Sequence, residues 1–69
     1  MPNHPNLKNN LKALRMAKGL TQAELAMVVE VSRKTINTVE NGVFIPSTIL
    51  SLRLASALSV TVEDLFQLR

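Results

Sequence analysis

The chain has 69 residues, enough for one small domain, and no cysteine, which excludes disulfide bonds and thiolate metal sites. Apolar residues make up 46% of the sequence but aromatic residues only 3%, which favours short packed helices over a sheet. The net charge of +3 is compatible with a polyanionic partner but does not require one.

Targeting, membrane and catalytic signals are not evident in the sequence. The N-terminus, MPNHPN, is polar and contains two prolines, and no apolar run approaches the roughly 18 residues of a membrane helix. We therefore expect a cytoplasmic protein that is not associated with a membrane. The single histidine, His4, cannot form a metal cluster alone, and there is no Gly-rich phosphate loop. Neither an enzyme nor a site for a cofactor, metal or small-molecule ligand is expected.

Residues 1–5 are predicted to be a disordered tail, and residues 6–69 a single domain. A first helix is predicted over LKNNLKALRMAK, with Asn6 as its N-cap and Gly19 as its left-handed C-terminal residue. Its apolar residues recur at the spacing of one helix face: Leu7, Leu11, Leu14 and Ala17.

Two further helices follow, from about residue 22 to 28 and from residue 33 to 40. Their boundaries are indicated by a T-x-x-E capping box at Thr21 and Glu24, a cap at Ser32 and a stop at Asn41-Gly42. So few residues separate the two helices that they must meet at a tight corner. Two short helices arranged in this way form a helix-turn-helix.

The remainder of the chain predicts an extended connection and two more helices. The residue before Pro46 avoids the helical region, Ser47 can cap the helix TILSLRLASAL, and Thr61 with Asp64 can form a second capping box. The expected fold is all-α, a compact five-helix bundle. Several apolar residues near these helices are expected to lie mostly in the core, or to supply a dimer interface: Phe44, Ile45, Ile49, Leu50, Leu65, Phe66 and Leu68.

The register of the second and third helices suits a DNA-binding motif. Counted from Gln22, apolar residues fall at the fourth, eighth, tenth, fifteenth and eighteenth positions: Leu25, Val29, Val31, Ile36 and Val39. Ala26 is small enough for the third helix to cross close above it, which would let that helix enter a major groove. An ordinary helical hairpin would use a similar pattern and is the alternative.

Four segments resemble the phage repressor and Cro-type helix-turn-helix domains, also called the xenobiotic response element family: LKALRMAKGLTQAELA, VSRKTINTVENG, PSTILSLRLASAL and VTVEDLF. The combination of T-Q-x-E-L-A, V-S-x-x-T-I and E-N-G is specific, and the resemblance covers residues 7–66. It implies a lambda-repressor-like DNA-binding domain that acts as a homodimer on a two-fold operator.

The sequence departs from the family pattern at five positions. Glu30 and Ser59 replace two usual glycines, Met27 and Val28 replace charged residues, and Val43 replaces a basic residue. If positions 30 and 59 require positive φ, each substitution costs on the order of 1 kcal/mol relative to glycine. The other three changes remove charge that would face phosphate and add exposed apolar surface.

The outward face of the third helix holds the candidate base-reading residues: Arg33, Lys34, Asn37 and Thr38. Cations in a first helical turn are disfavoured by the helix dipole, and arginine can bind guanine through two parallel hydrogen bonds. The candidate phosphate-binding residues are Gln22, Thr35 and Asn41. The alternative for each residue is structural: a solvated side chain, a hydrogen bond within the first turn, or helix termination.

The resemblance also implies an internal ion pair between Arg15 and Glu40 that ties the first helix to the end of the third. The sequence therefore indicates a sequence-specific transcriptional regulator, a repressor, which binds double-stranded DNA as a homodimer. The alternative is a protein-interaction module, antitoxin-like or adaptor-like, that uses the same fold through its apolar patches.

Overall fold

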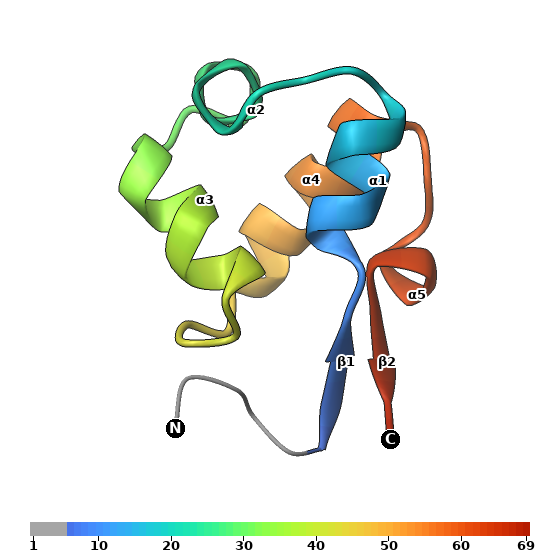
Figure 1. The fold of residues 1–69 in the computed structure, drawn as a ribbon. Helices are drawn as coiled ribbons and strands as arrows, with labels where there is room; N and C mark the ends of the chain where they lie inside the picture. Colours follow the sequence, from blue (N-terminus) through green and yellow to red (C-terminus); the bar gives the residue numbers. More distant parts are fainter. Residues whose placement is uncertain (1–5) are drawn as a thin grey trace.

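The computed structural model describes residues 6–69, which form five helices and one two-stranded sheet (Figure 1). The elements are β1 (Leu7–Asn9), α1 (Leu11–Ala17), α2 (Gln22–Val29), α3 (Arg33–Glu40), α4 (Thr48–Leu58), α5 (Val62–Leu65) and β2 (Phe66–Leu68). The predicted five-helix fold is confirmed, with a small sheet in addition. The tail predicted at residues 1–5 lies outside the described residues. Within residues 6–69, no helix is long and apolar enough to cross a membrane.

The prediction that the first helix begins after Asn6 is wrong, because residues 7–9 form β1. This strand pairs antiparallel with β2, with Leu7 opposite Leu68. Asn9 Oδ1 accepts a hydrogen bond from the backbone N–H of Leu11 at 3.0 Å, so α1 begins only there. The helical spacing of the apolar residues is a local signal, whereas the backbone partner of β1 comes from the other end of the chain. Ala17, expected on the buried face, is exposed.

The remaining helices lie where their caps predict. α3 and α4 have the expected bounds, and α2 extends one residue beyond the expected end. All the predicted cap hydrogen bonds are present, including both capping boxes. Glu30 and Ser59, which replace two usual glycines, have φ values of 62° and 57°. Both residues therefore adopt the left-handed conformation, as the family pattern implied.

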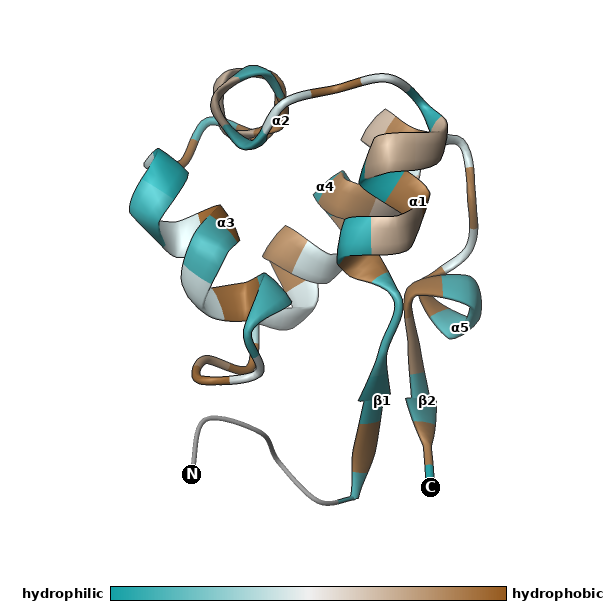
Figure 2. Ribbon diagram, viewed as in Figure 1, coloured by the Kyte–Doolittle hydropathy of each residue, from teal (hydrophilic) through white to brown (hydrophobic). Residues whose placement is uncertain are grey.

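One hydrophobic core lies between the helices, whose hydrophobic residues are coloured brown in Figure 2. Its buried members are Leu11, Leu25, Ala26, Val29, Ile36, Val39, Leu50, Leu54, Ala55, Leu58 and Leu65. The expectation of burial is wrong for Phe44, Ile45 and Ile49, which are 47%, 53% and 65% exposed. The first two lie in the connection that runs outside the bundle between α3 and α4, and Ile49 lies on the outer side of α4. Leu68, offered as core or dimer interface, is 88% exposed.

Candidate nucleic-acid interface

α2 and α3 form a helix-turn-helix in which α3 lies at the edge of the molecule. Figure 1 views α2 along its axis, while α3 runs across that direction on the outer side of the domain. The turn between them is closed by a 3.0 Å hydrogen bond from the Val31 N–H to the Ala26 carbonyl. Ala26 is only 3% exposed, and Leu25, Val29, Ile36 and Val39 are buried, as the register predicted. Val31 is partly buried against the same core.

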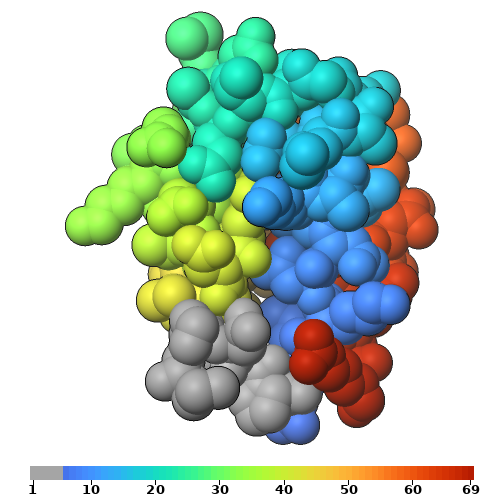
Figure 3. All heavy atoms as spheres, in the orientation of Figure 1, coloured from blue at the N-terminus to red at the C-terminus, as the bar shows by residue number. Residues whose placement is uncertain are grey.

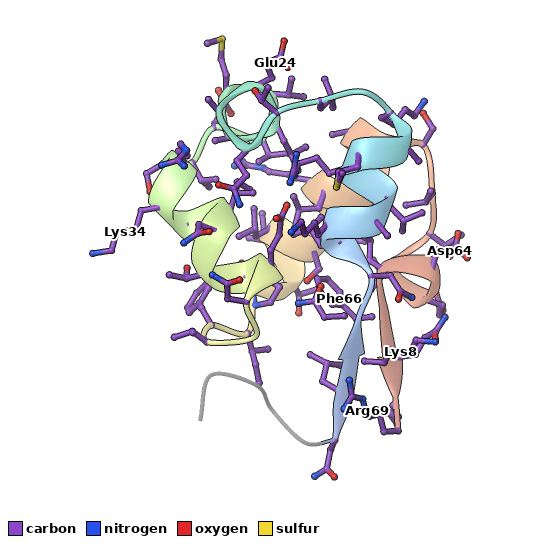
Figure 4. All side chains as sticks on the ribbon, in the orientation of Figure 1. Lys8, Glu24, Lys34, Asp64, Phe66 and Arg69 are labelled. Carbon is purple, nitrogen blue, oxygen red and sulfur yellow. The ribbon has the colours of Figure 1, made fainter. Side chains whose placement is uncertain are left out.

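The first turn of α3 presents two free cations to solvent. Arg33 and Lys34 are exposed, whereas Ile36 and Val39 anchor the opposite side of the helix in the core. The Lys34 side chain points away from the domain in Figure 4, and the start of α3 projects from the surface in Figure 3. The Ser32 hydroxyl accepts a hydrogen bond from the Thr35 N–H at 3.1 Å, which fixes where this turn begins. The two positive side chains can therefore reach a neighbouring polyanion without rearrangement of the helix.

The two threonines of α3 are partly engaged by the protein itself. Thr38 Oγ1 donates to the Thr35 carbonyl at 3.0 Å, and Thr35 Oγ1 lies 2.9 Å from the Ser32 hydroxyl. Both line a hollow of about 360 Å³ beside α3, together with Lys34 and the exposed Val43 and Phe44. Apolar surface beside a polar helix face is suited to contact with the methyl group of thymine.

Arg15 and Glu40 form an ion pair between α1 and the end of α3. Arg15 Nε donates to Glu40 Oε2 at 2.6 Å, and Nη2 donates to Oε1 at 3.3 Å. Arg15 Nη1 also donates to the Leu20 carbonyl at 2.7 Å. The Glu40 side chain is only 2% exposed and that of Arg15 10%, so water screens the pair little. The pair thus ties α3 to α1 and to the loop before α2.

Gln22, a candidate phosphate ligand, directs its amide toward α3. Its Nε2 donates to Asn37 Oδ1 at 3.2 Å and to Glu40 Oε1 at 3.1 Å. Asn41 Nδ2 lies 3.4 Å from the same Asn37 oxygen. The structure therefore joins two candidate phosphate residues, one candidate base-reading residue and the ion pair in one network. No spacing in the sequence indicated the two contacts of Gln22, because they depend on how α2 crosses α3.

Asn9 supports the candidate interface from behind and was missed by sequence reasoning. Its Nδ2 donates to the carbonyl of Val39 at 2.6 Å, and this bond links β1 to the last turn of α3. An asparagine before a helix is a cap signal, and Asn9 does accept a bond at the start of α1. Its second bond connects residues thirty positions apart and has no local signal.

The chain is similar over most of its length to proteins named as HTH-type transcriptional regulators that are themselves uncharacterized. The helix-turn-helix family model HTH_3 matches residues 11–65. The HTH-type transcriptional regulator YgzD of Bacillus subtilis is 39% identical over 62 residues, which cover 90% of this chain and 94% of that protein. An HTH-type transcriptional regulator of Methanocaldococcus jannaschii is 42% identical over 60 residues, with 87% and 91% covered.

Two solved structures share the fold. The restriction-modification controller protein C.AhdI from Aeromonas hydrophila superposes with a TM-score of 0.76 at 36% identity, covering 80% of this chain and 83% of that one. The clp gene regulator ClgR from Corynebacterium glutamicum has a TM-score of 0.75 at 33% identity, covering 78% of this chain and 57% of that one. The chain belongs to the Cro/C1-type helix-turn-helix family of DNA-binding transcriptional regulators.

Proposed function

We propose that this regulator is a repressor that binds a two-fold operator as a homodimer, with α3 of each protomer in the major groove. The observation that carries the proposal is the two-sided character of α3. Its inner residues are buried in the core, while Arg33 and Lys34 are exposed on a helix that lies at the edge of the domain. Contacts to phosphate supply most of the affinity in such complexes, and contacts to base edges supply the sequence preference.

The outer side of α4 is the surface that we assign to the dimer. Ile49 and Leu52 are 65% and 57% exposed, one helical turn apart on α4. Leu52 also borders an open groove of about 580 Å³, lined further by Ala55, Val60 and Val62. Clustered apolar surface on a small domain supports a protein contact there. In a two-fold dimer on DNA, the two α3 helices would lie about 34 Å apart, one turn of the duplex.

Repression is the mode of action that needs no further element. A dimer that fills two successive major grooves physically excludes other proteins from the same stretch of DNA. An operator placed across a promoter would therefore lower transcription in proportion to its occupancy. A reporter gene behind such a promoter should lose expression when the protein is supplied, and a rise in expression would contradict repression.

The decisive experiment is selection of bound sites from a random pool of duplex DNA, followed by analytical ultracentrifugation of the complex. We expect a palindromic site that binds two chains. Leu52→Glu should leave a single chain bound per palindromic operator at the concentration that saturates the wild type, and weaken binding at least tenfold. Met16→Glu is the control, because Met16 is an apolar residue 59% exposed on α1 rather than on α4.

The outcomes separate the two functions. A single chain bound to a non-palindromic site would exclude the homodimer but keep the DNA-binding function. Retention of no DNA even at low salt would exclude DNA binding, and would favour a protein-interaction module instead. The exposed Met27 and Val28 on α2, at 79% and 60%, would then be the first surface to test for a partner.

A further inference from the structure

The hydrogen-bond network behind α3 fixes which atoms of its side chains can face DNA. The argument begins at the ion pair, because a guanidinium has only donors and a carboxylate only acceptors. Glu40 Oε1 accepts from Arg15 and lies 3.1 Å from the Gln22 amide. The atom of Gln22 that faces Glu40 must therefore be its NH₂ group. The positions of the nitrogen and oxygen in the Gln22 amide are therefore determined by the negative charge of Glu40, although the two atoms are similar in size.

The orientation of Gln22 in turn determines that of Asn37. The Gln22 NH₂ group has two hydrogens, and its second partner is Asn37 Oδ1 at 3.2 Å. Asn41 Nδ2 approaches the same oxygen at 3.4 Å. Asn37 therefore turns its oxygen toward protein donors. Its Nδ2 group donates no hydrogen bond to any other residue within 6–69. Two N–H groups are left for an outside partner on a half-buried residue of the reading face.

We propose that Gln22 is a positioning residue that makes Asn37 a donor-only reader of the major groove, selective for guanine or thymine. This inference rests on the proposed function. Asparagine reads adenine by donating to N7 and accepting from the N6 amino group at once. Asn37 Oδ1 has two lone pairs, which face the Gln22 and Asn41 amides, so the adenine amino group would meet no free acceptor. Cytosine offers only a donor at this edge. Guanine offers O6 and N7, and thymine offers O4, all of which accept.

The same network bears on the phosphate role expected for Gln22. Both of its amide hydrogens are used inside the protein, so its side chain could reach phosphate only by breaking these bonds. Its remaining free atom, Oε1, is an acceptor and does not bind an anion. Any phosphate at the start of α2 would be bound by the backbone N–H groups of Gln22 and Ala23, because the N–H of Glu24 already donates to Thr21 Oγ1.

The test measures which base is preferred at one position of the selected operator. The base pair read by Asn37 is first identified as the operator position at which the Asn37→Ala protein loses its sequence preference. Binding is then measured by fluorescence anisotropy to four operators that differ only there, for the wild type, Gln22→Met and Gln22→Lys. The wild type should bind guanine or thymine about tenfold more tightly than adenine or cytosine, as expected for one good base contact.

The two Gln22 variants separate positioning from phosphate binding. Methionine has a similar length but no donor, so Asn37 can rotate, and adenine should come within about twofold of the best base. Lysine keeps N–H donors toward both Glu40 and Asn37, so the Gln22→Lys protein should rank the four operators as the wild type does. In the double variant with Asn37→Ala, Gln22→Met should not change the ranking further. Circular dichroism at the assay temperature establishes that each variant is folded.

Three results would overturn the proposal. One is a wild-type preference for adenine at the Asn37 position, which tests the inference even if Gln22→Met does not fold. Another is a uniform loss of affinity for all four operators with Gln22→Met, which would mean that Gln22 contributes to overall affinity and does not position Asn37. The third is an Asn37→Ala protein that keeps the wild-type ranking at every position. Failure of the wild type to bind any DNA would instead overturn the proposed function.

Discussion

Asn9 donates a 2.6 Å hydrogen bond from its side chain to the backbone carbonyl of Val39, and this bond holds β1 against the last turn of α3. The oxygen of the same amide accepts from the Leu11 N–H at 3.0 Å. One side chain thus defines where α1 begins and where the end of α3 lies. The helix that carries the candidate reading face therefore depends on a residue thirty positions away in the sequence.

Asn9→Ala should lower the free energy of unfolding by about 1–3 kcal/mol, because two hydrogen bonds are lost. Asn10→Ala is the matched control, because Asn10 makes one exposed bond, to the Asp64 carbonyl at 3.1 Å. Its loss should cost less, about 0.5–1 kcal/mol. Urea denaturation monitored by circular dichroism measures both values. Equal losses would mean that the link to Val39 adds nothing to stability.

Glu30 is exposed and has a φ of 62°, a conformation that glycine adopts without steric strain. Glu30→Gly should therefore stabilise the domain by up to about 1 kcal/mol. Glu30→Ala keeps the Cβ atom and should give no such gain. Thermal melting compares the three proteins. A melting temperature that is unchanged or lower with glycine would show that the strain is absent or is offset by the added flexibility of the unfolded chain.

The two capping boxes should make stability depend on pH. The backbone N–H of Thr21 donates to Glu24, and that of Thr61 donates to Asp64; these bonds, followed by those to the threonine side chains, lower the pKa of each carboxyl. The unfolded chain then binds more protons than the folded one as pH falls past the ordinary pKa values of 4.5 and 3.8. The contribution of the two boxes to the free energy of unfolding is complete above these ordinary pKa values. It is lost as pH falls through the lowered pKa values of the folded protein.

The part of the free energy of unfolding that depends on Glu24 and Asp64 should therefore be nearly constant from neutral pH to about pH 5. It should decline below that pH. Glu24→Gln combined with Asp64→Asn keeps an oxygen acceptor in each box but removes both titrations. The decline should become shallower in this double variant. Identical pH profiles for the two proteins would assign acid sensitivity to other carboxyl groups.

Much of the fold could be predicted because its signals are local. Ser32 and Asn41-Gly42 bound α3, and Ser47 marks the start of α4, through hydrogen bonds that span only a few residues. The pairing of β1 with β2 could not be predicted in this way, since Leu7 and Leu68 meet only after the bundle has formed. Phe44 and Ile45 were misjudged because apolar character alone does not tell whether a connection lies inside or outside a small core.

The candidate site was predictable in its outline and not in its hydrogen bonding. Helical periodicity places Ile36 and Val39 inward and Arg33 and Lys34 outward, and the structure agrees. The contact between Gln22 and Asn37 depends on the crossing of α2 over α3, which periodicity does not specify. Residues that appear equivalent on a helical wheel thus differ in which of their atoms remain free.

The last prediction concerns the two cations at the start of α3. Arg33 and Lys34 lie in the first turn, where the helix dipole disfavours positive charge, and both side chains are exposed. Their placement is unfavourable for the isolated domain by a few tenths of a kcal/mol and would become favourable against DNA. If they read bases, losing one contact should cost about 1–3 kcal/mol and relax the preference at one base pair.

Arg33→Ala and Lys34→Ala should therefore each weaken the base preference at defined positions of the selected operator. Binding to all single-base variants of the operator measures this preference. Lys8→Ala is the matched control, because it removes the same charge from an exposed residue of β1, away from α3 and from the α4 surface assigned to the dimer (Figure 4). If Arg33 and Lys34 bind only phosphate, their loss would weaken all variants alike and reduce the slope of log affinity against log salt by about one. If the two residues read bases, their substitution should instead change the order of affinity among the single-base variants. A wild-type ranking that survives both substitutions would mean that other residues of α3 read the sequence.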